Sequence, residues 1–394
     1  MSISRAMEES IEKSSWIRKM FEEGAKLAAI HGRENVYDFT LGNPNVEPPE
    51  AFYKALSECA DTAGRPVHGY MPNGGYPDVR AAVAEFASKE LGAPLTANEI
   101  IMTCGAAGAL NVALKAIVNP GDEVLTPAPF FAEYTFYVQN HGAVLKTVPT
   151  NPDFSLNIDA FRAAISEKTA AVIINSPNNP TGQVYSRESL DALAQALTEG
   201  GKKHGRTIYL ISDEPYRRIV YDGAEVPPVF ESYPDSMVAT SYSKELSIPG
   251  ERIGWLAVHP KAADKDKLIA AMTLANRILG FVNAPALMQR VIAKILGAGV
   301  DVSHYARKRE LLTEGLKEAG YVFEKPRGAF YLFMKSPIED DVAFVRELQS
   351  KERILTVPGR GFGGPGHIRI AFCVDDETIK KAIPGFARVL KSVG

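Results

Sequence analysis

Cysteine and long apolar runs are both scarce in this chain. The three cysteines, Cys59, Cys104 and Cys373, are far apart and form no CxxC pair, which excludes a disulfide framework and a cysteine-based metal site. No apolar stretch reaches the roughly 18 residues that a membrane-spanning helix needs. Residues 1–19 are charged throughout and lack the apolar centre of a signal peptide. We therefore expect a cytoplasmic protein with no metal site and no membrane partner.

The chain also lacks an excess of charge of either sign. It has 44 basic and 47 acidic residues, a net charge of −3. Proteins that bind nucleic acids usually carry a basic excess, so this balance argues against such a partner. The 394 residues exceed the usual size of one hydrophobic core, which predicts two domains.

What the sequence does contain is a regular alternation of strand-like and helix-like segments in its middle. Helical patterns, clearest at 105–118 and 186–198, separate short apolar β runs. Near-continuous apolar strands between helices predict an α/β fold with a mostly parallel sheet that is covered on both faces. The predicted strands are 99–103, 122–126, 143–148, 170–175, 207–212 and 237–241.

The pattern changes after residue 300. A charged helix is followed there by two strand-like segments, which predicts a smaller α+β unit. An amphipathic helix at 14–30 precedes the large core and is expected to join that unit. We therefore predict a large domain over residues 50–296 and a small domain formed by residues 1–49 and 297–394.

Small and polar residues follow the predicted strands, where ligands bind in open α/β sheets. Gly105-Ala106-Ala107-Gly108 opens a helix, and free N–H groups at a helix start favour a phosphate. Asp213 ends an apolar strand, where an ionised carboxylate needs a partner such as a protonated pyridine nitrogen. Lys244 ends Ser241-Tyr242-Ser243-Lys244 near Arg252, a setting that suits a Schiff base to a carbonyl cofactor whose phosphate the hydroxyl and guanidinium hold.

Each of these motifs also has an ordinary structural explanation. The glycine-alanine loop could serve only close helix packing, Asp213 could cap a helix, and Lys244 could be a solvated strand end. Phe131 could stack on a planar ring or simply join the core. The run Asn178-Asn179-Pro180-Thr181-Gly182 could be a plain turn. One motif at a time, the residues leave both explanations open.

In their order along the chain, these motifs resemble those of the fold-type I, pyridoxal-phosphate-dependent class I/II aminotransferases, the aspartate aminotransferase-like family. The resemblance covers nearly the whole chain. It implies a mostly parallel, seven-stranded sheet in a large pyridoxal-phosphate-binding domain, with a smaller α+β domain built from both chain ends. The matching motifs are Leu41-Gly42-Asn43-Pro44, Tyr70 with Gly74-Gly75, Gly105-Ala106-Ala107-Gly108, Pro129-Phe130-Phe131-Ala132-Glu133-Tyr134, Asn178-Asn179-Pro180-Thr181-Gly182, Asp213-Glu214-Pro215-Tyr216, Ser241-Tyr242-Ser243-Lys244 with Arg252, and Arg369.

The resemblance implies roles around the cofactor ring. Lys244 would form the Schiff base with pyridoxal 5'-phosphate and move the proton, and Asp213 would pair with the pyridine nitrogen. Asn179 and Tyr216 would hydrogen-bond the ring oxygen, and Phe131 would stack on the ring. The phosphate would be held by Ala106, Ala107, Ser241 and Arg252.

The resemblance also implies substrate contacts and a homodimer with shared active sites. Arg369 would bind the substrate α-carboxylate in a bidentate manner, with Gly42 and Asn179 beside it. Tyr70 would reach the phosphate of the neighbouring subunit. Arg277 is the candidate for a side-chain carboxylate, and Asn283 lies in the segment that relatives bring over a neighbour's pocket.

The expected function is transamination between an L-amino acid and a 2-oxo acid. An acidic substrate, aspartate or glutamate, requires that Arg277 face the pocket; a neutral or aromatic one is expected if it points away. A β-lyase or a decarboxylase would use the same Lys244, Asp213 and Arg369. A non-catalytic cofactor-binding regulator is less favoured, because such proteins usually carry a DNA-binding module for which this chain has neither length nor basic charge.

The run Gly361-Phe362-Gly363-Gly364-Pro365-Gly366 formally matches a dinucleotide-binding pattern. It precedes a predicted strand rather than a helix, so the required strand–glycines–helix context is missing. We expect a glycine-rich loop of the small domain instead.

Overall fold

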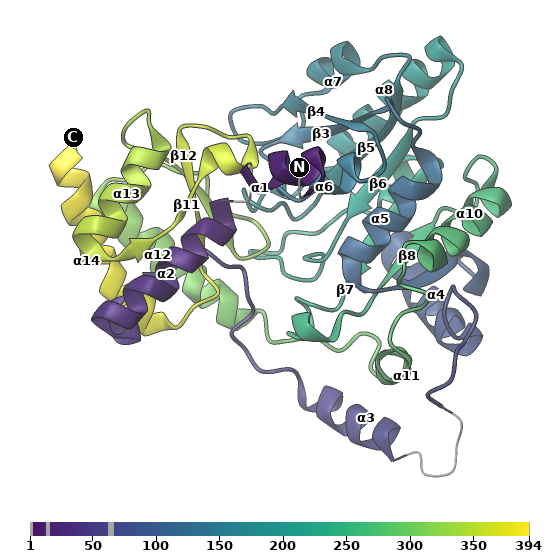
Figure 1. Ribbon diagram of the computed structural model, residues 1–394, viewed down its shortest axis with the longest axis horizontal. Coiled ribbons are helices and arrows are strands. Elements are labelled where there is room, and N and C mark those ends of the chain that lie inside the picture. The colour runs from purple at the N-terminus through teal and green to yellow at the C-terminus, as the bar shows by residue number, and fades with distance from the viewer. Residues whose placement is uncertain (1–2, 13–15, 62–66, 394) are drawn as a thin grey trace.

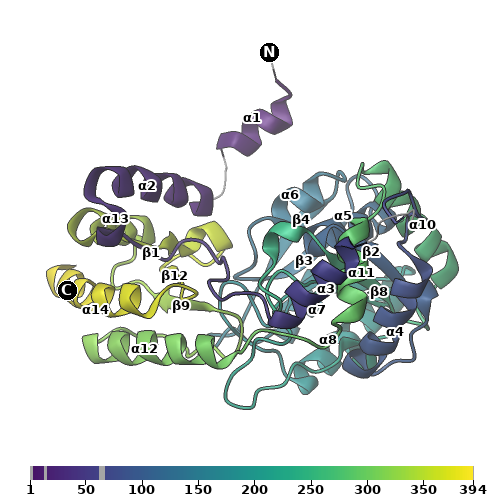
Figure 2. The same cartoon turned by 90° about the horizontal axis from the view of Figure 1, so that it is seen from below.

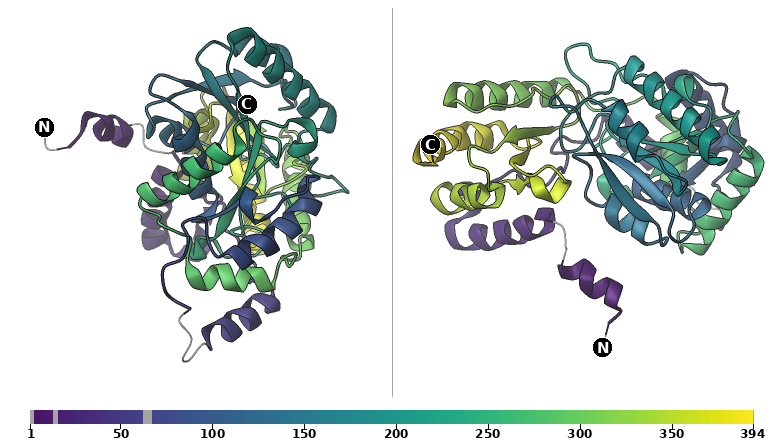
Figure 3. Two further views of the ribbon diagram at one scale, coloured as in Figure 1. Left: turned by 90° about the vertical axis from the view of Figure 1, so that its right-hand side faces the viewer. Right: turned by 90° about the horizontal axis from the view of Figure 1, so that it is seen from above.

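The computed structural model describes residues 3–12, 16–61 and 67–393. They form two bodies, a larger one that carries a seven-stranded sheet and a smaller one that carries two short sheets (Figure 1). Figure 2 shows the two bodies side by side, with α1 (Arg5–Glu12) projecting away from both. The projection of α1 is seen again from two further directions in Figure 3.

The larger body is built on the mostly parallel α/β sheet that the sequence predicts. Its strands are β2 (Ile100–Thr103), β3 (Glu123–Ala128), β4 (Val144–Pro149), β5 (Thr169–Asn175), β6 (Tyr209–Asp213), β7 (Ser236–Ser241) and β8 (Gly254–Val258). Their order across the sheet is β2-β8-β7-β6-β5-β3-β4. β8 runs antiparallel to both its neighbours, and the other neighbouring strands are parallel. The six predicted strands are confirmed to within two residues at either end; β8 was not predicted.

Both faces of this sheet are covered. Alternate residues of β5 enter different cores, Val172 and Ile174 on one face and Ala171 and Ile173 on the other. The first core also contains residues of α3 (Glu50–Ala60), α4 (Pro77–Leu91), α7 (Ile158–Ala164), α8 (Arg187–His204), α9 (Val229–Ser232) and α11 (Ala286–Lys294). The second contains residues of α5 (Gly105–Ile117), α6 (Tyr134–Gln139) and α10 (Lys265–Ile278).

The smaller body combines segments from both ends of the chain. Its elements are α2 (Trp16–His31), β1 (Tyr37–Asp38), α12 (Ser303–Ala319), β9 (Tyr331–Lys335), α13 (Asp341–Glu352), β10 (Ile354–Leu355), β11 (Val357–Pro358), β12 (His367–Ala371) and α14 (Asp376–Val393). β1 pairs in parallel with β10, and β11, β12 and β9 form an antiparallel sheet. The predicted domain limits fall at Pro49, just before α3, and in the turn after α11. These limits stay a prediction.

Short 3₁₀ turns complete the fold at η1 (Arg33–Asn35), η2 (Ala97–Glu99), η3 (Pro249–Glu251) and η4 (Gly359–Phe362). The glycine-rich run that formally matches a dinucleotide pattern begins in η4 and leads into strand β12, not into a helix. Its first part lies against the larger body, where the Phe130 amide donates to the Phe362 carbonyl at 2.9 Å. Within the described ranges, no helix combines the length and the apolar character needed to cross a membrane.

Candidate active site

A cavity of about 280 Å³ lies where strands of the large sheet end. Asn175, Asp213 and Ser241 are the last residues of β5, β6 and β7, three neighbouring parallel strands, so the sheet brings them to one edge. β9 and β12 of the smaller body approach the same space. The residues that line the cavity are Leu41, Gly42, Ala106, Ala107, Leu110, Phe131, Tyr137, Asn175, Asn179, Asp213, Pro215, Tyr216, Ser241, Ser243, Lys244, Pro249, Arg252, Tyr331 and Arg369.

Lys244 enters the cavity from the turn after β7. Its Nζ donates a hydrogen bond to the carbonyl oxygen of Gly42 at 2.8 Å and lies 5.5 Å from the ring centre of Phe330. Burial lowers the pKa of Lys244 to about 8, and the positive charges of Arg252 and Arg369 act in the same direction. A lysine with such a pKa has a substantial neutral fraction near pH 7–8 and can therefore act as a nucleophile.

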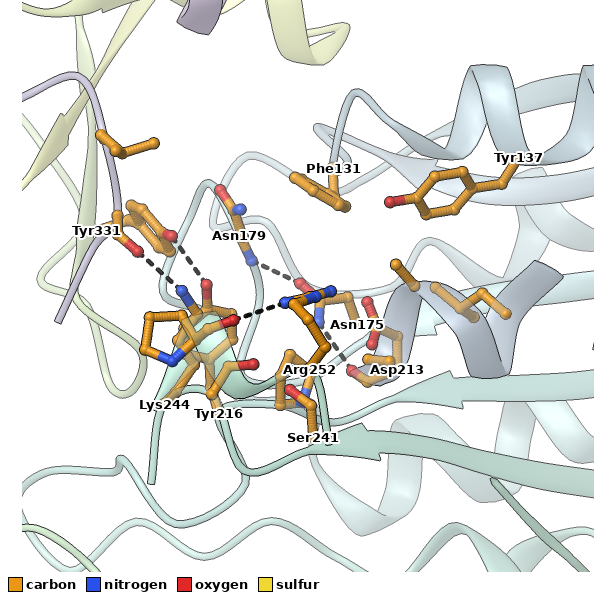
Figure 4. A pocket seen from close by; sticks show the side chains of 18 of the residues that line it. Phe131, Tyr137, Asn175, Asn179, Asp213, Tyr216, Ser241, Lys244, Arg252 and Tyr331 are labelled. Atoms are coloured by element: carbon orange, nitrogen blue, oxygen red, sulfur yellow. Dashed lines mark hydrogen bonds between the residues drawn. The ribbon is translucent and has the colours of Figure 1, made fainter. Parts of the chain in front are cut away.

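Asp213 offers the cavity an unpaired carboxylate oxygen. Its Oδ2 accepts a hydrogen bond from the hydroxyl of Tyr134 at 2.5 Å, while the buried Oδ1 has no partner among the described residues. Burial raises the pKa of Asp213 to about 7, and the charge of Glu214 adds to the rise, whereas the Tyr134 hydrogen bond opposes it. Figure 4 shows Asp213 and Lys244 on opposite sides of the space. A cationic group placed between them would satisfy Oδ1.

Asn175 ties the two strand ends together. Its Nδ2 donates to the backbone oxygen of Asp213 at 2.8 Å, and its Oδ1 accepts from the backbone amide of Asn179 at 2.7 Å. Across the cavity, the hydroxyls of Tyr216 and Tyr331 hydrogen-bond at 2.8 Å (Figure 4). The polar groups of the site are therefore held in fixed positions by their neighbours.

The start of α5 and Arg252 form a site suited to an anion. Gly105, the first residue of α5, has φ +73°, and a Cβ there would lie only 3.1 Å from Nη2 of Arg252. Arg252 itself has a left-handed backbone, φ +51°, and its Nη1 donates to the carbonyl of Pro249 at 2.9 Å. Free N–H groups of Ala106 and Ala107 at a helix start, beside a guanidinium, are what a phosphate requires.

Arg369 is buried without a carboxylate partner among the described residues. Its Nη1 donates to Oδ1 of Asn179 at 3.0 Å, its Nη2 donates to the carbonyl of Thr40, and its Nε is unpaired. The guanidinium lies between two aromatic rings, 4.7 Å from the ring centre of Tyr331 and 4.6 Å from that of Phe362. A buried cation with an unpaired N–H can bind a carboxylate ligand.

The family of this chain follows from a comparison with known proteins. Residues 34–386 match the family model described as aminotransferase class I and II. The chain belongs to this family. It is therefore a pyridoxal-phosphate-dependent aminotransferase, a transferase of nitrogenous groups, as the sequence motifs predict.

Similar proteins match this aminotransferase over most of their length. It is 34% identical to the aspartate/prephenate aminotransferase of Thermus thermophilus over 89% of this chain and 90% of that protein. Its fold superposes on the crystal structure of an amino transferase from Eubacterium rectale with a TM-score of 0.96, at 43% identity, covering 100% of this chain and 99% of that one. The aspartate aminotransferase of Thermus thermophilus, solved with maleate, gives a TM-score of 0.87 at 29% identity, covering 99% and 100%.

The groups that line the cavity fit pyridoxal phosphate. The amine of Lys244 suits its aldehyde, the unpaired Oδ1 of Asp213 suits a protonated ring nitrogen, and Arg252 with the start of α5 suits its phosphate. Phe131 borders the same space, with its ring held edge-on by Tyr134 at 5.6 Å between ring centres. The aminotransferase thus presents a matching group for the aldehyde, the ring nitrogen and the phosphate of the cofactor.

Two of the predicted site residues lie outside this cavity. Tyr70 is 94% exposed, and Arg277 is exposed near the end of α10. The contact expected of Tyr70 with the phosphate of a neighbouring subunit and that expected of Arg277 with a side-chain carboxylate stay predictions. The two lie in connected segments, because Asn73 donates to the Val282 carbonyl at 2.8 Å and accepts, through its own carbonyl, from Asn276 at 2.7 Å. Tyr70 and Arg277 are therefore exposed on two chain segments that are hydrogen-bonded to each other.

The remaining prediction for this surface concerns Asn283. It is half-buried beside α5 and does not line the cavity; its Nδ2 donates to the Ala284 carbonyl at 2.9 Å. Conversely, Asn175, Tyr134, Tyr137 and Tyr331 belong to the site or support it although no role was predicted for them. Asn175 could have been found as the last residue of a strand that ends beside Asp213.

Proposed function

We propose that this aminotransferase transfers the amino group of an L-amino acid to a 2-oxo acid, with Lys244 as the Schiff-base residue. The observation that carries the proposal is one juxtaposition. An amine whose pKa is lowered to about 8 and a buried carboxylate with an unpaired oxygen line the same cavity. Bound pyridoxal phosphate supplies a ring that accepts the electron pair left behind when a substrate loses its α-proton.

The residues around the ring position have distinct tasks in this proposal. Asp213, whose Oδ1 has no partner among the described residues, would pair with the ring nitrogen and favour its protonated form. Tyr216 and Asn179 would hydrogen-bond the ring oxygen, and Phe131 would cover one ring face. The phosphate is held by Ala106, Ala107, Ser241 and Arg252, all of which line the cavity.

Lys244 also moves the proton. A neutral Nζ accepts the α-proton of the substrate, and the lowered pKa supports this task because less energy is needed to remove its own proton. The phenol of Tyr216 lies near the same amine, with a ring centre 5.9 Å from Nζ. The nearby Arg252 and Arg369 disfavour the charged form of Lys244 until an anion neutralises them.

Arg369 binds the substrate α-carboxylate in this proposal. Its planar fork is buried and its Nε has no partner among the residues described, so a carboxylate would satisfy it. Gly42, whose carbonyl already accepts from Lys244, and Asn179, whose Oδ1 accepts from Arg369, lie beside that position.

For the substrates, we propose an acidic pair, aspartate or glutamate with the matching 2-oxo acid. Support comes from the names of relatives that act on aspartate and from the maleate, a dicarboxylate, bound in the Thermus thermophilus enzyme. Arg277 is exposed and does not line its own cavity, so the proposal requires a homodimer in which it reaches the partner's cavity. The exposure of Leu274 and Ile278 beside it, and of Tyr70 nearby, supports such an interface.

We also propose the cytoplasm as the location. Cys59, Cys104 and Cys373 are free of disulfides, as is usual for proteins of a reducing compartment.

The Schiff-base assignment is tested with the Lys244→Ala variant. Purified wild-type protein should show a visible cofactor band that borohydride bleaches, and the variant should lose both the band and all but a trace of activity. A bleachable band that survives in Lys244→Ala would place the reactive amine elsewhere. If ammonia or carbon dioxide formed in place of a new amino acid, the enzyme would catalyse elimination or decarboxylation and not transamination.

The substrate assignment is tested with a spectral panel of amino acids against the holoenzyme. Aspartate and glutamate should convert the cofactor band at the lowest concentrations, and Arg277→Ala should weaken only these two, by about 10- to 100-fold. Arg346→Ala, an exposed arginine of α13, serves as the control and should change nothing. Equal responses to alanine or phenylalanine in the wild type would overturn the acidic preference.

A further inference from the structure

Tyr331 stands where three parts of the site meet. It is the first residue of β9, lines the cavity and is 3% exposed. Its ring contacts the guanidinium of Arg369, its hydroxyl bonds to that of Tyr216, and a Cβ added at Gly42 would overlap the same hydroxyl. A residue that only filled the core would not need to touch all three.

The ring of Tyr331 bears on how Arg369 is held. The two acceptors of Arg369, carbonyl oxygens of Thr40 and of the Asn179 side chain, fix two corners of the guanidinium. They do not fix its plane. The rings of Tyr331 and Phe362 fix the plane of the guanidinium, because their centres lie 4.7 and 4.6 Å from its central carbon. Contacts of this kind stabilise a desolvated cation.

The hydroxyl of Tyr331 bears on how Tyr216 is oriented. Each phenol has one proton to donate. If the Tyr216 hydroxyl donates to the cofactor ring oxygen, the bond between the two tyrosines must run from Tyr331 to Tyr216. A hydroxyl that accepts one hydrogen bond becomes a stronger donor in the next. The 2.8 Å contact therefore orients the Tyr216 proton and strengthens its bond.

We propose that Tyr331 is a positioning residue for transamination, whose ring sets the plane of Arg369 while its hydroxyl orients that of Tyr216. One side chain thus aligns the group that binds the substrate with a group that binds the cofactor. The inference rests on the proposed function, since it takes the roles of Arg369 and Tyr216 from it. It also explains Gly42, because any side chain there would displace the Tyr331 hydroxyl.

Three holoenzyme variants separate the two tasks. Tyr331→Phe keeps the ring and removes the hydroxyl, Tyr331→Leu removes both, and Phe362→Leu removes the opposite ring of the sandwich as a matched control. The first measurement is the pH midpoint at which the visible cofactor band changes, which reports on Tyr216. The second is the dissociation constant of an α-methyl amino acid, which has no α-proton to lose and reports on Arg369.

We expect the variants to affect the pH midpoint and the α-methyl amino acid affinity differently. Tyr331→Phe should raise the pH midpoint by about 0.5–1 unit, because a weakened Tyr216 donor leaves more charge on the ring oxygen to hold the neighbouring proton. Its α-methyl amino acid affinity should stay within about twofold of the wild type. Phe362→Leu should do the opposite, weakening that affinity by about 3- to 30-fold with an unchanged midpoint. Tyr331→Leu should show both effects.

Two results would overturn the inference. One is an unchanged midpoint in Tyr331→Phe, and the other is equal changes of both measurements in all three variants, which a general loosening of the fold would cause. If Tyr331→Leu fails to fold, Tyr331→Met takes its place as the variant without the ring. A wild type without a bleachable band would instead refute the proposed function, so the two failures are distinguishable.

Discussion

The two walls of the active site hold their polar groups in different ways. The sheet wall is the side formed by Asn175, Asp213 and Ser241, and the small-body wall is the side formed by Tyr331 and Arg369. On the sheet wall, neighbouring strands and the two bonds of Asn175 fix the groups. On the small-body wall, Arg369 is held between rings and carbonyl oxygens. The cofactor is thus expected to contact mainly the sheet wall, and the substrate carboxylate the small-body wall.

The largest effect should come from Asp213→Asn on the sheet wall. The amide cannot balance a protonated ring nitrogen, and removal of one partner of a buried charge pair lowers activity by about 10²- to 10⁴-fold. The measurement is kcat/KM with saturating cofactor. Asp122→Asn, which breaks the more exposed pair with Arg206, is the control and should stay within about twofold. If kcat/KM fell by less than tenfold in Asp213→Asn, the expected difference between the two walls would be contradicted.

Arg369→Lys should produce the next largest effect, and on a different parameter. Lysine keeps the charge but not the planar fork, so KM for the amino acid should rise by about 10- to 100-fold. The cofactor dissociation constant should not change, because Arg369 lies on the other wall. Weakened cofactor binding in Arg369→Lys would contradict the assignment of cofactor binding to the sheet wall and substrate binding to the small-body wall.

Lys244→Met should stabilise the cofactor-free protein at pH 7. The pKa of Lys244 is lowered in the folded state to about 8 from 10.5, so the unfolded chain binds more protons between these values. The wild-type protein is therefore destabilised below about pH 8 and gains stability as the pH rises toward 10.5. We expect a gain of about 1–3 kcal/mol at pH 7 in urea unfolding, shrinking by pH 10. A constant gain at both pH values would assign it to packing alone.

Tyr134→Phe should give the smallest effect. It removes the hydrogen bond that opposes the raised pKa of Asp213, so that pKa should move further above about 7. Because Asp213 must be ionised to pair with a cation, the pH midpoint of cofactor affinity should shift upward by about 0.5–1 unit. Tyr233→Phe, which loses a buried bond to the Ile208 carbonyl, is the control for general destabilisation. A midpoint that moves equally in both variants would contradict a specific role.

The sheet wall was the more predictable from the sequence. Parallel strands with helical crossovers gather their carboxyl ends, so the strand pattern alone is enough to expect Asp213, Ser241 and Lys244 together. Asn175 was overlooked because it reads as the last residue of an apolar strand. β8 was overlooked because it follows the Arg252 loop directly, without the helix that separates parallel strands.

The small-body wall was harder to predict. Tyr331 lies in a run of apolar residues, Ala329 to Phe333, in which every side chain looks like core. Its contacts with Arg369 and Tyr216 depend on how two bodies far apart in the sequence pack together. The roles expected of Tyr70 and Arg277 stay predictions, because both side chains are exposed and neither lines the cavity of its own chain.

The hydrogen bond from Lys244 to the Gly42 carbonyl has a consequence for how the protein is loaded. An ammonium has three protons to donate, and a lysine nitrogen bonded to the cofactor would keep at most one, so Lys244 would have less capacity to hydrogen-bond the Gly42 carbonyl. Gly42 lies between β1 of the smaller body and α3 of the larger body, on a crossing point of the chain. The contact between Lys244 of the larger body and the segment that connects the two bodies is therefore expected to weaken when the cofactor binds.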